Sequence, residues 1–160
     1  MANELKGNAP LVQVEHLKKY FQVGRGKVLH AVDDVTFSIP KGTTLGLVGE
    51  SGCGKTTVGR TLVGLYQPDG GKITFDGQDI THLKGKEKRA ITRRMQMVYQ
   101  DPYASLNPFF TVGEIITEGL EIHNIGESTK ERMEIAYGLL NRVGLNREHA
   151  NRFPHEFSGG

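Results

Sequence analysis

The chain has 160 residues, of which 37% are hydrophobic and 24% are charged, and its formal net charge is only +2. This composition predicts a folded globular domain rather than a disordered chain, and the small charge gives no reason to expect nucleic acid as a partner. No apolar run approaches the roughly 18 residues that span a bilayer, and residues 1–16 lack the apolar stretch of a secretory signal. The single cysteine excludes an intrachain disulfide, which fits a reducing cytoplasm. The six histidines do not have the spacing of metal ligands, so no metal site built of protein ligands is expected.

The first half of the chain is predicted to be rich in β-strands. Residues 1–10 are polar, end at a proline and are interpreted as a loose N-terminal tail. Residues 22–27 carry glycine and charge and are predicted to form a turn or loop. A hairpin is predicted at 72–80, because Asp76 and Gly77 separate two strand-like runs. Three further strands are expected at residues 11–14, 35–39 and 44–48. The strand at 44–48 is expected to be buried on both faces, because it is apolar throughout.

The second half is predicted to be mostly helical. A helix is expected from Thr56 to about residue 66, a basic helix at 83–94, and another strand at 95–99. Two later helices have capping-box start signals, Thr-Val-Gly-Glu from Thr111 and Ser-Thr-Lys-Glu from Ser128. Gly144 is expected to end the second of these helices.

The strongest chemical signal is the run GESGCGKT at 49–56, which matches the phosphate-loop pattern G-x-x-x-x-G-K-[ST] in full. Glycines allow the backbone to wrap around phosphate oxygens, and the helix that follows adds the positive end of its dipole. Lys55 is expected to bridge the β- and γ-phosphates and Thr56 to ligate Mg²⁺, whereas Cys53 is interpreted as a small side chain that fits a tight turn. The expected nucleotide-binding residues are Gly49, Glu50, Ser51, Gly52, Cys53, Gly54, Lys55, Thr56 and Thr57.

The residues around this loop resemble those of one family. GLVGESGCGKTTVGRTLVGL at 46–65, MQMVYQDPYASLNP at 95–108, TVGEII at 111–116 and RFPHEFSGG at 152–160 together resemble ATP-binding subunits of ABC transporters. They look most like the branch that imports oligopeptides and dipeptides. The resemblance covers residues 11–160 and implies a phosphate-loop α/β fold with an antiparallel β subdomain, the start of a parallel core and, from about 101, the start of a helical subdomain.

The resemblance also implies roles for residues outside the phosphate loop. Gln100 matches the family glutamine that touches Mg²⁺ or a water, and it is counted with Lys55 as catalytic. Phe21 matches the aromatic residue that stacks on adenine, with Tyr20 as its competitor. The signature motif that faces the γ-phosphate held by a second subunit begins at Ser158, Gly159 and Gly160, although a plain Ser-Gly-Gly tail is the alternative.

The function implied by the resemblance is ATP binding and hydrolysis that drive peptide uptake. The cofactors would be ATP and Mg²⁺, and the partners would be transmembrane subunits, docked around residues 101–125, and a second ATP-binding subunit at the cytoplasmic face of the membrane. The chain would then be the N-terminal half of the domain, without the Walker B aspartate, the catalytic glutamate and the switch histidine.

Other classes of function stay open on the sequence alone. They are a soluble ABC-type ATPase that acts on nucleic acid, a non-catalytic interaction module and a phosphate-loop kinase. The basic segment at 84–94 is the feature that suggests nucleic acid, and a solvated helix face is the simpler interpretation.

Overall fold

The computed structural model describes residues 9–101 and 105–157. The chain divides into two compact units, residues 1–97 and 98–160. The first contains a four-stranded sheet with two helices, and the second contains helices alone among its described residues. Most of the predicted tail and the residues Ser158, Gly159 and Gly160 fall outside the described residues.

The sheet of the first unit is antiparallel throughout. Its strands are β1 (Val12–Gly24), β2 (Lys27–Ile39), β3 (Gly70–Phe75) and β4 (Gln78–Asp79), in the spatial order β2-β1-β3-β4. β3 and β4 form the hairpin that the Asp76-Gly77 signal predicts. Both turn residues have positive φ, 51° and 80°, which is the backbone form that such two-residue hairpin turns require.

The first two strands are much longer than the predicted strands at 11–14 and 35–39, and they pair with each other as a hairpin. The turn predicted within 22–27 is present, but it is limited to Arg25 and Gly26, because both strands continue into this segment. Gly24 pairs with Lys27 across that turn, and Gly26 has a φ of 71°. The polar side chains of this segment concealed the strands, because a hairpin tip exposed on both faces shows no apolar alternation.

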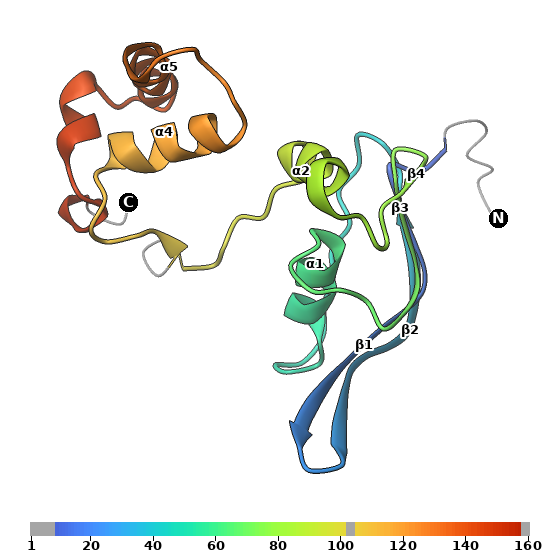
Figure 1. Ribbon diagram of the computed structural model, residues 1–160. Helices are drawn as coiled ribbons and strands as arrows, with labels where there is room; N and C mark the ends of the chain where they lie inside the picture. Colours follow the sequence, from blue (N-terminus) through green and yellow to red (C-terminus); the bar gives the residue numbers. More distant parts are fainter. Residues whose placement is uncertain (1–8, 102–104, 158–160) are drawn as a thin grey trace. The chain divides into compact units, whose positions relative to one another are not determined.

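Helices α1 (Lys55–Leu62) and α2 (Gly85–Arg94) lie on the same side of the sheet (Figure 1). Val58 of α1 and Ile91 of α2 join the buried strand residues in one hydrophobic core. α1 ends four residues before the predicted position, because Gly64 adopts a left-handed conformation and its N–H donates to the carbonyl of Thr61. The strand residues of this core are Val12, Val14, Leu17, Val32, Ile73 and Phe75.

Two predicted strands are wrong. Residues 44–48 and 95–99 have no strand pairing, and none of their residues is buried. Val48 is 90% exposed and Val98 is 96% exposed. A strand forms only where a neighbour accepts and donates its backbone hydrogen bonds, and within the described residues no strand lies beside either segment. The apolar pattern therefore predicted neither the strand conformation nor the burial of these two segments.

The second unit contains α4 (Val112–Ile122), α5 (Thr129–Arg142) and two short 3₁₀ helices at Arg147–Asn151 and Pro154–Glu156. Thr111 and Glu114 form the predicted capping box at the start of α4. Ser128 accepts the predicted bond from the N–H of Glu131, but the carboxylate of Glu131 accepts instead from the N–H of Glu127. The small core of this unit consists of Ala136, Leu140 and Ala150.

Candidate nucleotide-binding site

The phosphate loop precedes α1 directly, and its lysine folds back over it. The Lys55 ammonium donates to the carbonyl oxygens of Gly49 at 2.8 Å and Glu50 at 2.6 Å. It also lies 3.4 Å from the sulfur of Cys53. These bonds hold a positive charge across the open side of the loop, where an anion would be bound.

The start of α1 has the features of an anion-binding helix end. Its N-cap is Gly54, which has a φ of 94° and brings no side chain to cap the first N–H groups. No acidic residue of the described chain occupies the first turn of α1, so the positive end of the helix dipole is not neutralised locally. The amides at this end are therefore oriented for an external acceptor, as in other phosphate loops.

A hollow of about 330 Å³ joins the loop to the β1–β2 hairpin. Phe21 lines it from β1, and the loop supplies the other predicted residues on its wall. The set of predicted site residues that the fold brings together is Phe21, Gly52, Cys53, Gly54, Lys55, Thr56 and Thr57. Gly49, Glu50 and Ser51 lie in the exposed part of the loop, where the first two hold Lys55 by their carbonyl groups.

The structure separates the two candidate aromatic residues, Phe21 and Tyr20. Phe21 lines the hollow. Tyr20 follows the opposite alternation of the strand: its ring stacks on His30, with 4.1 Å between the ring centroids, and its hydroxyl donates to Asp33 at 2.6 Å. This bond raises the pKa of Tyr20 to about 12 and lowers that of Asp33. Tyr20 is thus engaged with β2, and the geometry favours Phe21 as the residue that meets a base.

Sequence analysis missed three residues of the hollow, all from β2: Leu29, Ala31 and His30, the residue on which Tyr20 stacks. Leu29 pairs with Phe21 across the hairpin, so its apolar side chain lies on the same face. The carbonyl of Ala31 lies against Gly54. The turn alone would not have placed them, because a register shift between Gln22 and Gly24 moves the pairing by one residue, so that Phe21 lies opposite Leu29 and not opposite His30.

Gln100 is an exposed residue of the second unit. The phosphate loop belongs to the first unit, so the predicted contact of the Gln100 side chain with Mg²⁺ stays a prediction. Thr56, the other predicted magnesium ligand, is exposed and lines the hollow. One hydroxyl oxygen fits Mg²⁺, which prefers oxygen donors and takes most of its ligands from waters and nucleotide phosphates. No three His, Cys, Asp or Glu side chains gather into a metal site among the described residues.

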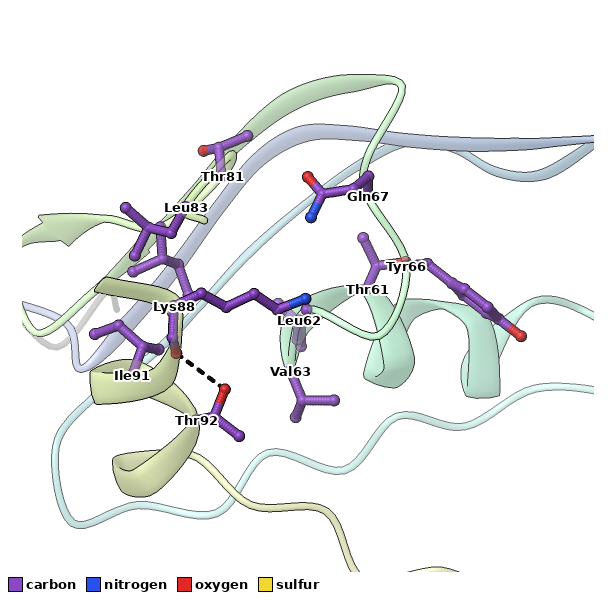
Figure 2. Close-up of a pocket in the computed structure, with 12 residues that line it drawn as sticks. Thr61, Leu62, Val63, Tyr66, Gln67, Thr81, Leu83, Lys88, Ile91 and Thr92 are labelled. Atoms are coloured by element: carbon purple, nitrogen blue, oxygen red, sulfur yellow. Dashed lines mark hydrogen bonds between the residues drawn. The ribbon is translucent and has the colours of Figure 1, made fainter. Parts of the chain in front are cut away.

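A second, smaller hollow lies between the end of α1 and α2 (Figure 2). Its volume is about 20 Å³, which is room for roughly one water and not for a nucleotide. Thr61, Leu62 and Val63 line one side, and Lys88 and Ile91 line the other. We interpret it as a packing gap between two helices.

Comparison with known proteins identifies the family. The ABC transporter family matches residues 32–160, which include the whole phosphate loop and the second half of β2. The chain belongs to the ABC transporter family. The prediction of family from the flanking motifs is confirmed. Within the described residues, no helix of this family member has the length and apolar character needed to cross a membrane.

Curated ABC transporter relatives include several peptide-transport proteins. The chain is 54% identical over 151 residues to the oligopeptide transport ATP-binding protein OppF of Bacillus subtilis, which covers 94% of the chain and 49% of that protein. It is 45% identical over 150 residues to OppF of Streptococcus mutans, and 48% identical over 151 residues to a putative peptide import ATP-binding protein of Brucella ovis. The chain spans about half the length of these relatives.

Solved ABC cassettes share the fold. One is a dimeric, post-hydrolysis ATP-binding cassette, MJ0796, bound to ADP and Pi. It is 25% identical, with a TM-score of 0.75, over 92% of this chain and 63% of that one. A second dimeric structure of the same bacterial ABC transporter cassette gives a TM-score of 0.74 over the same shares. The expected fold class, an ABC-type phosphate-loop cassette of mixed α/β structure, is confirmed.

Proposed function

We propose that this chain is the nucleotide-binding portion of the ATP-binding subunit of an oligopeptide or dipeptide importer. The observation that carries the proposal is the hollow in which Phe21 and the loop residues from Gly52 to Thr57 line one space. A nucleoside triphosphate needs both surfaces, because its base stacks on an aromatic ring while its phosphates accept hydrogen bonds from loop amides. The peptide-transport names of relatives at 45–54% identity support the choice of cargo.

The residues of the hollow have separate tasks in this proposal. Lys55 moves from the carbonyls of Gly49 and Glu50 toward the β- and γ-phosphates, and the amides at the start of α1 orient the phosphate oxygens. The hydroxyl of Thr56 holds Mg²⁺, which offsets the negative charge of the phosphates when it is bound. Phe21 holds the base, with Leu29 beside it.

The wider proposal concerns the whole protein. Gln100 links the nucleotide site to transmembrane subunits that dock around residues 101–125, and Ser158, Gly159 and Gly160 meet the γ-phosphate held by a second ATP-binding subunit. The dimeric solved cassettes of the family support the pairing. The protein would then hydrolyse ATP at the cytoplasmic face of the membrane.

A soluble ATPase that acts on nucleic acid is the second candidate, and the basic helix α2 is the feature that suggests it. The structure engages two of its cations within the chain. Arg94 pairs with Asp76 and lies 4.9 Å above the Phe75 ring, and Lys88 lies along Gly64. The remaining basic side chains form a solvated helix face, which supports the transport proposal over nucleic-acid binding.

Calorimetric titration of the chain with Mg-ATP tests the nucleotide site. Lys55→Ala removes a charge-assisted contact and should weaken binding by roughly 10- to 150-fold. The matched control is Lys86→Ala, which removes an equal charge from the exposed face of α2 and should leave the affinity unchanged. Equal dissociation constants for the wild type and a folded Lys55→Ala variant would refute the proposal.

A further inference from the structure

We propose that Tyr66 is a positioning residue that orients the Phe21 ring for stacking on a nucleotide base; the inference rests on the nucleotide-binding function proposed above. The two rings meet edge to face, with 5.2 Å between centroids and 79° between ring planes. This is the arrangement that aromatic pairs prefer, because the positive edge of one ring meets the negative face of the other. Tyr66 can therefore select one orientation of Phe21.

Tyr66 is fixed to the phosphate-loop helix. Its hydroxyl accepts a hydrogen bond of 3.0 Å from the Arg60 guanidinium, whose carbon lies 5.9 Å from the centre of the Tyr66 ring. The backbone N–H of Tyr66 also donates to the carbonyl of Arg60. The ring points away from the small hollow beside α2 (Figure 2). Tyr66 thus connects Phe21 of β1 to α1, whose first residue is Lys55.

A second contact restrains the Phe21 ring through charge. The Lys19 ammonium lies 5.2 Å from the ring centre and is paired at 2.9 Å with Asp69. Asp69 also accepts a 2.7 Å bond from the N–H of Tyr20, and these donors lower its pKa. Lys19 and Tyr66 together restrain Phe21, while Phe21 still lines the hollow.

The restraint is needed because Phe21 lies near the exposed end of the hairpin. Val23 is 59% exposed and Leu29 is 52% exposed, so strand packing alone gives the ring few neighbours. Without Tyr66, the Phe21 side chain would sample more rotamers and lose entropy when a base binds. Tyr66 reduces this entropy loss, because it restrains the Phe21 ring before the base binds. It also keeps the ring at a fixed position relative to the phosphate loop.

The test separates base binding from phosphate binding. Dissociation constants for Mg-ATP and for magnesium tripolyphosphate, which has no base, are measured by calorimetry on the full chain. Tyr66→Leu should weaken ATP binding roughly two- to tenfold and leave tripolyphosphate binding unchanged. Tyr66→Phe keeps the ring and loses only the hydroxyl bond, so it should retain most of the affinity and covers the case in which the leucine variant fails to fold.

Tyr137→Leu is the matched control, since Tyr137 also packs against an arginine, Arg147, but lies in the other unit. It should leave both affinities unchanged. A Tyr66→Leu variant that binds both ligands less tightly by the same factor, or binds both as the wild type does, would overturn the inference. A wild type that binds tripolyphosphate and ATP equally would also overturn it and leave phosphate binding standing. A wild type that binds neither ligand would refute the proposed function itself.

Discussion

The backbone of Gly54 lies so close to the carbonyl oxygen of Ala31 that no side chain fits at position 54. A Cβ atom placed there would fall well under 3.0 Å from that oxygen. Ala31 belongs to β2 and Gly54 caps α1, so this contact sets the distance between the hairpin and the phosphate loop. The glycine that the motif requires for phosphate access is also required for packing.

Gly54→Ala should therefore destabilise the chain and weaken ATP binding together. The new methyl group meets a backbone oxygen that cannot rotate away, and the φ of 94° adds strain of about 1–3 kcal/mol. Gly52→Ala is the matched control, because φ is 81° there but nothing lies within 4 Å. Urea unfolding should show a clearly larger loss for position 54. Equal losses of unfolding free energy at positions 52 and 54 would mean that the backbone at Ala31 shifts to make room for the new methyl group.

The phosphate loop could be predicted from sequence because its chemistry depends on a short run of adjacent residues. The motif at 49–56 fixes the glycine conformations, the lysine and the helix start together. The capping box of Thr111 and Glu114 is equally local, and it forms as predicted. The antiparallel hairpin at Asp76 and Gly77 also follows from its own turn chemistry.

The segments that could not be predicted depend on distant partners. An apolar run such as 44–48 indicates that a segment prefers burial, but it does not indicate which strand pairs with that segment. The strand residues on either side of the Arg25-Gly26 turn were missed for the opposite reason, since these exposed residues show no regular alternation of apolar and polar side chains. Leu29 enters the hollow only through its pairing with Phe21, a contact between residues of two strands.

Thr81→Val should destabilise the first unit by about 1–3 kcal/mol. The buried Thr81 hydroxyl accepts from the N–H of Ile73 at 3.0 Å and donates to Asp79 at 2.6 Å, so valine leaves a buried N–H unpaired. Thr92→Val is the control, because that hydroxyl bonds the carbonyl of Lys88 on an exposed helix face. Chemical denaturation measures both. The pKa of Asp79, which is lowered mainly by the Thr81 hydroxyl, should rise in Thr81→Val; an unchanged pKa and stability would contradict the bond.

The Tyr20–Asp33 bond should stabilise the fold below pH 10 and cease to do so in alkali. Folding raises the pKa of Tyr20 from 10.0 to about 12, so the neutral phenol is favoured in the native state. Its contribution is complete below pH 10 and is lost as the pH rises through about 12. The stability difference between wild type and Tyr20→Phe, measured by urea unfolding across this range, should shrink accordingly. In an Asp33→Asn background the shrinkage should be reduced, and an identical pH profile there would exclude Asp33 as its cause.

The exposed apolar segments should make the chain associate with itself. Val48 and Val98 are 90% and 96% exposed, and each lies in an extended run of apolar residues without a paired neighbour among the described residues. Such runs offer free backbone N–H and C=O groups together with apolar side chains, and they recruit other strands. Sedimentation velocity should show a mass that grows with protein concentration, and Val48→Lys or Val98→Lys should reduce that growth. Val143→Lys is the control: Val143 is 72% exposed but caps the end of α5, where no extended run is present. A chain that stays monomeric at every concentration, or lysine variants that associate as the wild type does, would show that these two segments do not act as open strands.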